Sequence, residues 1–275
     1  MIPVLSEGAG MSSRERLGLQ QWRARANSFG PAAALYDRIR PDYPAEAIEW
    51  ALRPLGAGAW RVVDVGAGTG IMTRRLLALG HEVLAVEPDD QMRARLAQTT
   101  PAATPLPGRA EAIPLPDASV DGAVAAQAYH WFDRDPAHEE LARVIRPGGV
   151  FAAVWNMRDE AVPWVAEYSR IVEGDAGRAP DQPSAGRDSP RPALDFGGCF
   201  ADTVLATFQH EIAHTPDTLV GLLQSRSYYI VASAERRREL EAEVRHLIAT
   251  HPDLAGRTQF PLRYQTEVHR AVRAA

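Results

Sequence analysis

A glycine-rich turn between a short apolar run and an amphipathic segment constrains the fold more than any other feature. The run Arg61–Val65 is typical of a buried strand, and Gly66, Gly68 and Gly70 follow it at alternate positions. Glycines let the chain turn sharply and let a ligand approach the backbone closely, and the N–H groups at the start of the next helix favour an anionic group. The pattern is G-x-G-x-G, unlike the G-x-G-x-x-G of dinucleotide sites. A tight turn without a ligand would explain the glycines equally well.

The elements after this turn alternate between strand and helix. Short apolar runs bounded by glycine or proline indicate strands, and longer amphipathic runs indicate helices. The expected elements are strand 61–65, helix 71–79, strand 82–86, helix 91–98, a connection at 99–108, strand 122–126, a helix capped by Asp135 with Pro136 at its first position and ending at 146–149, and strand 150–155. Such alternation predicts an α/β fold with a mainly parallel, doubly wound sheet.

The flanking regions have a different character. Residues 13–52 are expected to form helical segments interrupted by Pro41 and Pro44. Residues 174–198 are rich in glycine and proline and are expected to form a mobile loop or a lid. The elements expected after it are strand 203–212, helices 219–227 and 234–249, and a last strand at 262–272.

Acidic and aromatic residues follow the ends of several expected strands. Glu87 closes the second strand, about twenty residues after the glycines, where an acidic side chain can bind both hydroxyls of a ribose. A solvated carboxylate at a strand end would give the same residue without a ligand. The runs 108–116 and 127–132 also lie at or just past strand ends. Because open α/β sheets bind ligands at the carboxyl ends of their strands, these elements predict one shared site.

His130 is the histidine best placed to act as a general base, since its ordinary pKa lies near 6.5. The alternative is that it packs or forms hydrogen bonds at the strand end without moving a proton. Asp133, Asp135 and His138 resemble a group of metal ligands. Helix capping explains these residues better, and no metal is expected.

The charge balance and the single cysteine exclude several classes of protein. The chain has 30 Lys+Arg against 35 Asp+Glu and a net charge of −5, so we expect no nucleic-acid partner bound through its phosphates. Cys199 is the only cysteine, which excludes an internal disulfide. No apolar stretch approaches the roughly 20 residues that span a bilayer, and the first residues do not look like a signal peptide. We therefore expect a cytoplasmic protein without a membrane partner.

Together these motifs resemble those of class I S-adenosylmethionine-dependent methyltransferases, in the broad family of small-molecule and trans-aconitate-like enzymes. The similarity includes the lead-in 29–44, the Ala110-Glu111-x-Ile-Pro run with 117–121, and the runs 127–132 and 146–149. The resemblance implies a Rossmann-like sheet of seven strands with an N-terminal helical cap and an antiparallel C-terminal strand. It also implies a tail and helix at 1–28 before a single domain at 29–273, with a donor-binding core at about 58–156 and C-terminal helices and strands at about 203–273.

The cofactor that this resemblance implies is S-adenosyl-L-methionine. The donor-binding residues that it implies are Asp64, Gly66, Ala67, Gly68, Glu87, Ala110, Glu111 and Gln127. The aspartate and the glycines would hold the methionine part, Glu87 the ribose, and Ala110 with Glu111 the adenine. Arg109 departs from the family, in which an aspartate often accepts from the adenine amino group. Arginine has no acceptor, so a neighbouring carbonyl or Glu111 must take that role.

Three aromatic residues are expected on the substrate side or in a lid: Tyr36, Tyr43 and Trp131. Aromatic faces favour a cationic sulfonium, although simple core packing would also explain them. The expected function is methyl transfer to a small molecule, with O-methylation of a carboxylate or hydroxyl favoured, by a monomer or homodimer. The alternatives are a nicotinamide-dependent oxidoreductase on the same fold, a nucleic-acid or protein methyltransferase, and a donor-binding module without catalysis.

Overall fold

The apolar run before the glycine turn forms a central strand of a seven-stranded sheet. The computed structural model describes residues 30–173 and 193–274. Its strands are β1 Arg61–Val65, β2 Glu82–Val86, β3 Thr104–Leu106, β4 Val120–Ala126, β5 Ile145–Arg158, β6 Val204–His214 and β7 Phe260–Val272. The strand order is β3-β2-β1-β4-β5-β7-β6; β1 to β5 run parallel, and β7 is antiparallel to both of its neighbours. The expected sheet, with its antiparallel C-terminal strand, is confirmed.

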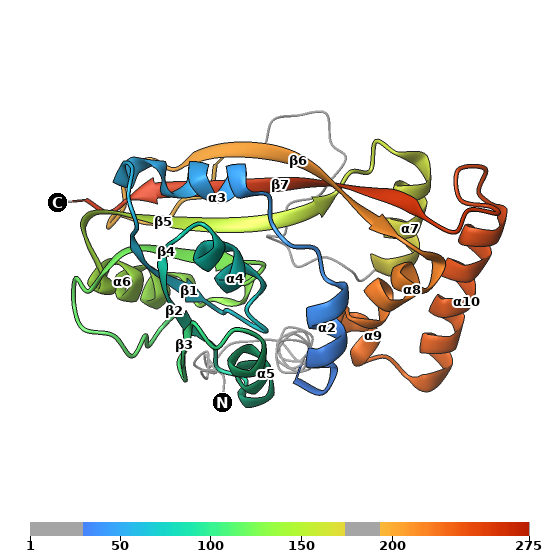
Figure 1. Cartoon of the computed structure of the whole chain (residues 1–275), viewed down its shortest axis with the longest axis horizontal. Helices are drawn as coiled ribbons and strands as arrows, with labels where there is room; N and C mark the ends of the chain where they lie inside the picture. Colours follow the sequence, from blue (N-terminus) through green and yellow to red (C-terminus); the bar gives the residue numbers. More distant parts are fainter. Residues whose placement is uncertain (1–29, 174–192, 275) are drawn as a thin grey trace, which may run out of the picture.

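Helices cover both faces of this sheet (Figure 1). They are α2 Ala33–Ile39, α3 Ala45–Leu52, α4 Ile71–Ala78, α5 Asp90–Thr99, α6 Arg134–Val144, α7 Pro163–Glu173, α8 Pro216–Gln224, α9 Ser227–Ile230 and α10 Ala234–Thr250, with 3-10 turns η1 Gly30–Ala32, η2 Arg53–Leu55 and η3 Tyr129–Trp131. Side chains along β1 alternate between the faces: Val62 packs with Leu76 of α4, and Val63 packs in the cluster that holds Leu141 of α6. This alternation follows from the two-residue period of a strand.

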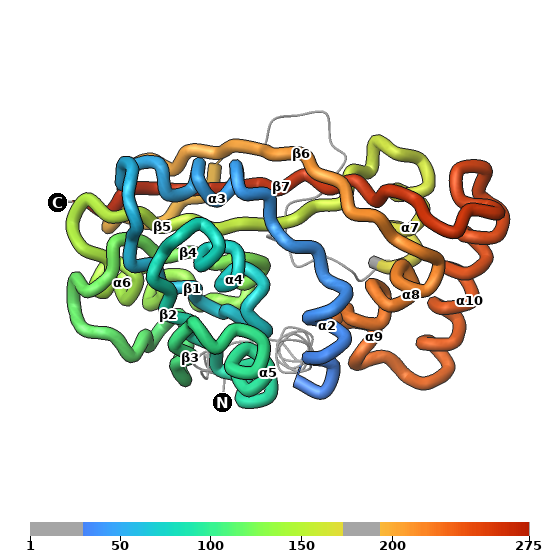
Figure 2. The backbone as a smooth tube through the Cα atoms, in the orientation of Figure 1, coloured from blue at the N-terminus to red at the C-terminus, as the bar shows by residue number. Residues whose placement is uncertain are grey.

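The last three strands extend past the others and carry a second cluster of helices (Figure 1). There α7, α8 and α10 pack on the beginning of β7 through residues such as Trp164, Leu219, Leu247 and Leu262. We call β1–β4 with α4–α6 the parallel core, and the far ends of β5–β7 with α7–α10 the C-terminal extension. The tube in Figure 2 shows α2 between them, beside α5 on one side and α8 and α9 on the other.

Several predicted boundaries within the core are wrong for identifiable reasons. The stretch 99–108 contains strand β3, in which Pro105 is tolerated because β3 is an edge strand. Helix α6 begins at Arg134 with Asp133 as its N-cap residue, so Asp135 and Pro136 lie in its first turn, where backbone N–H groups need no helical partner. The residues expected to end that helix, 146–149, belong to the start of β5 instead.

The largest differences lie in and before the C-terminal extension. Helix α7 is not among the expected elements, and the expected helix 219–227 divides into α8 and α9. Thr215 and Thr218 form a capping box that begins α8 at Pro216. Most of the expected mobile loop, 174–192, lies outside the described residues. Its last part is well packed, because Phe196 is buried against Phe151. No helix within the described residues is long and apolar enough to cross a membrane.

Candidate functional site

The turn after β1 adopts the left-handed backbone that glycine accepts at least cost. Gly66 has φ 72° and Gly68 has φ 58°. The N–H groups of Gly66 and Ala67 donate to the carbonyl of Val86 at 2.8 and 3.0 Å, which ties the turn to the end of β2. A Cβ on Gly66 would lie 2.6 Å from the Cβ of Ala128, whereas a Cβ on Gly68 would meet no protein atom within 4 Å. Gly66 therefore serves packing, and Gly68 leaves open space above the turn.

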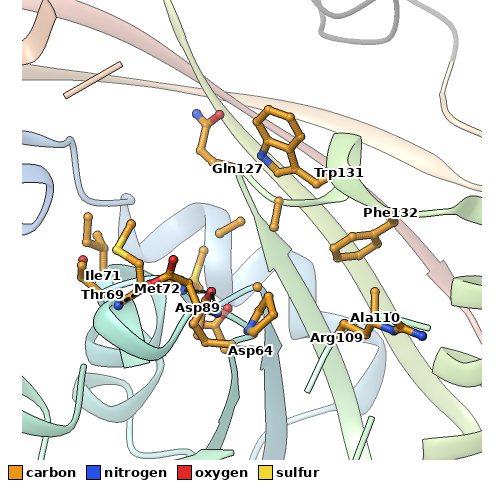
Figure 3. Close-up of a pocket in the computed structure, with 18 of the residues that line it drawn as sticks. Asp64, Thr69, Ile71, Met72, Asp89, Arg109, Ala110, Gln127, Trp131 and Phe132 are labelled. Atoms are coloured by element: carbon orange, nitrogen blue, oxygen red, sulfur yellow. Dashed lines mark hydrogen bonds between the residues drawn. The ribbon is translucent and has the colours of Figure 1, made fainter. Parts of the chain in front are cut away.

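That open space is a cavity at the carboxyl ends of β1, β2 and β4 (Figure 3). It is lined by all of the predicted donor-binding and aromatic residues: Tyr36, Tyr43, Asp64, Gly66, Ala67, Gly68, Glu87, Ala110, Glu111, Gln127 and Trp131. The sheet order reverses between β1 and β4, which is where open α/β sheets bind ligands. The structure thus brings these residues together, and their roles toward a ligand stay predictions.

Two buried acids dominate the electrostatics of the cavity. Asp64 is fully buried, and its Oδ2 accepts from the Thr73 hydroxyl at 2.6 Å. The carboxylate of Glu87 accepts from the N–H of Gly68 at 2.7 Å and from that of Asp89 at 2.8 Å. Burial raises the pKa of Asp64 to about 6 and that of Glu87 to about 7, although the hydrogen bonds oppose both rises.

The local fold explains why these acids are held in place. Asp64 is the fourth residue of β1, which pairs with β2 on one side and β4 on the other, and Thr73 of α4 holds its carboxylate. Glu87 directly follows β2, and Asp89 caps α5 by accepting from the N–H groups of Gln91 and Met92, both at 2.9 Å. Asp64 Oδ1 has no hydrogen-bond partner among the described residues. A buried acceptor without a partner costs free energy, so a donor group on a ligand would stabilise it.

At the predicted adenine end of the cavity, both carboxylate oxygens of Glu111 already contact other residues. Its Oε1 accepts from the N–H of Asp133 at 2.8 Å, and its Oε2 lies 3.8 Å from Nε of Arg109. Of the two acceptors that the sequence leaves open for an adenine amino group, these contacts favour a backbone carbonyl near Ala110 over the Glu111 side chain.

Gln127 lines the cavity and has a left-handed backbone conformation. Its φ is 53°, which is uncommon for a residue other than glycine. Its Nε2 donates to the carbonyl of Asn156 at 3.0 Å, and Nδ2 of Asn156 donates to the carbonyl of Asp42 at 2.8 Å. Strain of this kind often marks a functional site. Asn156 carries no motif that sequence reasoning could have used.

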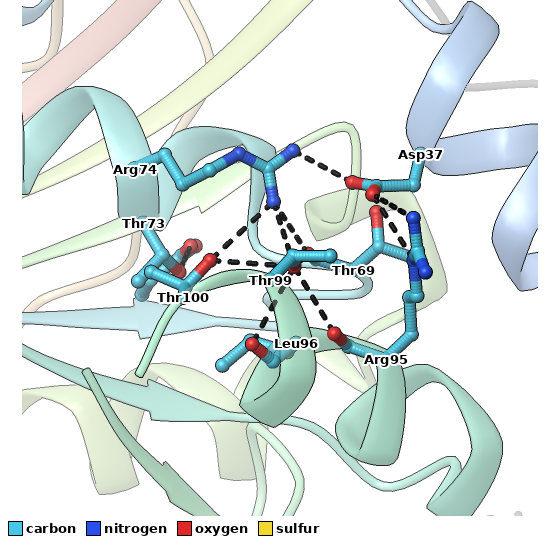
Figure 4. A network of polar contacts seen from close by, with 9 residues as sticks. Asp37, Thr69, Thr73, Arg74, Arg95, Leu96, Thr99 and Thr100 are labelled. Atoms are coloured by element: carbon cyan, nitrogen blue, oxygen red, sulfur yellow. Dashed lines mark hydrogen bonds and ion pairs between the residues drawn. The ribbon is translucent and has the colours of Figure 1, made fainter. Parts of the chain in front are cut away.

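A network of ion pairs fixes the cap helix α2 to the floor of the cavity (Figure 4). The buried carboxylate of Asp37 accepts from Arg74 of α4 at 2.6 Å and from Arg95 of α5 at 3.1 Å. Nη1 of Arg74 also donates to the carbonyl of Thr69, inside the glycine turn, at 3.0 Å. Tyr36 precedes Asp37 on α2, so this network positions an aromatic wall of the cavity.

His130 does not line this cavity. It lies in η3, and its ring packs against Trp131 with ring centroids 4.7 Å apart. Nε1 of the buried Trp155 donates to its Nδ1 at 3.4 Å. Trp131 faces the cavity, and His130 does not. This geometry supports the packing alternative, and the part of His130 in catalysis remains a prediction.

The cavity also includes residues outside the sequence motifs. They are Ile71, Met72, Pro88, Asp89, Met92 and Ala126. Met72 and Met92 supply apolar surface from α4 and α5, the helices that follow β1 and β2. Their place just after a strand end was the signal that could have found them.

Comparisons with known proteins agree with this arrangement. A methyltransferase domain family matches residues 63–153. An uncharacterized methyltransferase of Mycobacterium tuberculosis is 42% identical over 249 residues, which are 90% of this chain and 96% of that protein. A malonyl-[acyl-carrier protein] O-methyltransferase of Methylococcus capsulatus is 38% identical over 133 residues, 46% of this chain and 48% of that enzyme.

A solved structure from Anaeromyxobacter dehalogenans gives the same result for the fold. That protein is provisionally assigned to the type II methyltransferases; the two share 30% identity over 86% of this chain and 97% of the other, with a TM-score of 0.59. The similarity to the Mycobacterium protein extends over nearly the whole of both chains, so it covers the C-terminal extension as well as the parallel core. The chain therefore belongs to the methyltransferases of class I, with their Rossmann-like fold.

Proposed function

We propose that the cavity binds S-adenosyl-L-methionine and that the protein transfers its methyl group to an oxygen of a small-molecule acceptor. The observation that carries this proposal is the pair of buried acids at the glycine turn, Asp64 and Glu87, neither of which has an ion-pair partner among the described residues. A ligand that brings an ammonium group to Asp64 Oδ1 and ribose hydroxyls to Glu87 would supply charge-assisted hydrogen bonds to both. The open space above Gly68 allows such a ligand to approach the backbone.

For methyl transfer, the protein must orient two reactants and exclude water. When bound, the donor supplies a methyl group on a sulfonium: the acceptor atom bonds to the methyl carbon while the carbon–sulfur bond breaks and its electron pair stays on sulfur. Tyr36, Tyr43 and Trp131 present aromatic surface to the cavity, which favours a cation and keeps water out. Burial raises the pKa of Tyr43 well above its usual range, so its hydroxyl stays neutral and can donate a hydrogen bond.

The lining of the cavity favours an acceptor that needs no base. No histidine or lysine is among the described residues that line it. A carboxylate is ionised at neutral pH and can accept a methyl group without losing a proton. The Methylococcus relative is named a malonyl-[acyl-carrier protein] O-methyltransferase, which supports the same choice. We therefore favour a carboxylate oxygen over a hydroxyl.

Calorimetry tests the donor assignment directly. The purified protein is titrated with S-adenosylhomocysteine, the demethylated product, and separately with NAD. We expect saturable binding of S-adenosylhomocysteine and none of NAD. Binding of NAD without a response to S-adenosylhomocysteine would contradict the proposal and would favour an oxidoreductase. Turnover is then measured by transfer of labelled methyl from S-adenosylmethionine to carboxylates, phenols and amines.

A further inference from the structure

Three arginines from separate elements gather where the cap helix meets the C-terminal extension. Arg40 follows α2, Arg158 ends β5, and Arg226 precedes α9. Burial raises the pKa of Tyr264 in β7, and the charges of all three guanidinium groups oppose that rise. Nη2 of Arg40 donates to the carbonyl of Ser225, the residue before Arg226, so the segments that carry these two arginines are in contact. The buried Tyr264 hydroxyl has no hydrogen-bond partner among the described residues.

Two of these arginines lack a counterion. The side chain of Arg226 makes no hydrogen bond or ion pair with a described residue, and its Nε is buried. Nη2 of Arg40 donates to the carbonyl of Ser225 at 2.8 Å, but its Nε is buried without a partner. Burial, and next the charge of Arg226, lower the pKa of Arg40 to about 10. Buried like charges without a counterion are unfavourable, so this arrangement is poised to accept an anion.

The arginines adjoin the proposed donor cavity through its aromatic wall. The guanidinium of Arg40 lies 4.6 Å from the centroid of the Tyr36 ring, and Tyr36 lines the cavity. Tyr43 also lines it, and the charges of both Asp64 and Arg40 act on its hydroxyl. The tyrosines thus separate an acidic side, formed by Asp64 and Glu87, from a basic side at Arg40. In Figures 1 and 2, α2, which carries Tyr36, lies between the parallel core on one side and α8 and α9 on the other.

We propose that Arg40 and Arg226 bind a carboxylate of the acceptor and thereby hold it while a second carboxylate of the same molecule receives the methyl group. The inference rests on the proposed function, which it sharpens to a class of substrate with at least two acidic groups. Guanidinium groups present paired N–H donors that match the two oxygens of a carboxylate. The Tyr264 hydroxyl can donate to the same group. The described lining of the donor cavity has no such pair of cations, so anchoring and methyl transfer occupy different ends of the acceptor.

The test compares Arg226→Gln, Arg226→Lys and the control Arg38→Gln in the full chain. Arg38 is exposed on the same cap helix and takes no part in either site. Linear dicarboxylates from succinate to sebacate serve as acceptors, with butyrate and glycerol 3-phosphate as probes of a single carboxylate and of a phosphate. We expect Arg226→Gln to raise KM for the best dicarboxylate by roughly 10- to 100-fold, with kcat changed by less than about threefold. The KM of Arg226→Lys should lie between that of the wild type and that of Arg226→Gln, because lysine keeps the charge and loses the paired donors.

The melting temperature separates a binding role from a structural one. Because Arg226 is an unpaired cation beside two others, Arg226→Gln should leave the melting temperature of the free protein unchanged or higher. A lower melting temperature with an unchanged KM would overturn the inference. So would methylation of glycerol 3-phosphate or butyrate in preference to every dicarboxylate, or the absence of turnover with all dicarboxylates. S-adenosylhomocysteine binding should stay within twofold of wild type in every variant; its absence in the wild type would instead overturn the proposed function.

Discussion

The parallel core holds buried acidic side chains, whereas arginines gather where the cap helix meets the C-terminal extension. The two groups differ in how far apart their members lie along the sequence. In the core, Asp64 and Glu87 are buried beside the glycine turn and belong to one strand–turn–helix unit and the strand next to it. At the extension, Arg40, Arg158 and Arg226 come from three distant parts of the chain. The first site is therefore local in sequence, and the second exists only after the long strands and the cap helix are assembled.

We expect the largest effect from a substitution that disrupts the packing at the glycine turn. Gly66→Ala places a Cβ 2.6 Å from that of Ala128 at φ 72°. We expect a cost of about 2–4 kcal/mol in the free energy of unfolding, from overlap plus left-handed strain. At this chain length that lowers the melting temperature by roughly 5–15 °C. Gly80→Ala is the matched control, because Gly80 has φ 87° but nothing within 4 Å of its Cβ site.

The two glycine variants are compared by thermal unfolding and by titration with S-adenosylhomocysteine. Gly80→Ala should show only the strain, about 1–2 kcal/mol, with normal ligand affinity. Equal melting temperatures for the two variants would show that the contact with Ala128 relaxes freely. The turn would then not depend on packing against Ala128, the residue before η3.

The next effect concerns the acidic side of the cavity. Glu87→Gln should weaken S-adenosylhomocysteine binding by roughly 10- to 100-fold, because charge-assisted hydrogen bonds to the ribose contribute about 1.5–3 kcal/mol. Since burial raises the pKa of Glu87 to about 7, wild-type affinity should rise as the pH increases from 6 to 8. The variant should show no such rise. An affinity that is independent of pH in the wild type would remove Glu87 from the site.

The same pKa has the opposite consequence for the stability of the free protein. The unfolded Glu87 carboxyl ionises near pH 4.3, and the folded one near 7. Between these values the folded state binds more protons, so this group makes stability fall as pH rises. Denaturant unfolding of the wild type and of Glu87→Gln from pH 4 to 8 checks the sign. A smaller decline in the variant is expected, and an identical decline would mean that Glu87 ionises normally in the fold.

A smaller effect should follow from loosening the cap that joins the two regions. The side chain of Asp37 is only 9% exposed and pairs with Arg74 and Arg95, both about one-third exposed. Asp37→Asn should cost about 1–2 kcal/mol, less than a fully buried pair because of solvent screening. Asp42→Asn is the control, since Asp42 is 56% exposed and lies 3.8 Å from Arg75. Its cost should stay below about 0.5 kcal/mol, as measured by denaturant unfolding of both variants. Equal costs would show that the Asp37 network does not fix the cap.

The same difference between the two regions explains which elements and site residues could be predicted from the sequence and which could not. The bounds of β1 and β2 were predicted without error, because each is an apolar run closed by glycine or proline. The residues around the glycine turn were also predicted to converge, since parallel strands end at one edge of a sheet. In contrast, β3 was missed because its proline suggested a loop, and α7 was not expected at all. Arg226 carried no signal, because an isolated arginine in a sequence resembles an ordinary surface residue.

His130 is the residue for which sequence and structure differ most, and its substitution should have the smallest effect on turnover. A general base would lose roughly 10²–10⁴-fold in rate when removed. In the structure His130 lies outside the cavity and accepts from Nε1 of Trp155, which is buried. His130→Ala should therefore change turnover by less than about threefold and destabilise the fold by roughly 1–3 kcal/mol, because the indole N–H loses its acceptor. His130→Asn keeps an acceptor and should recover part of that stability. A hundredfold loss of turnover in both variants, with normal donor affinity and melting temperature, would restore His130 as the base and would favour a hydroxyl over a carboxylate as the methylated group.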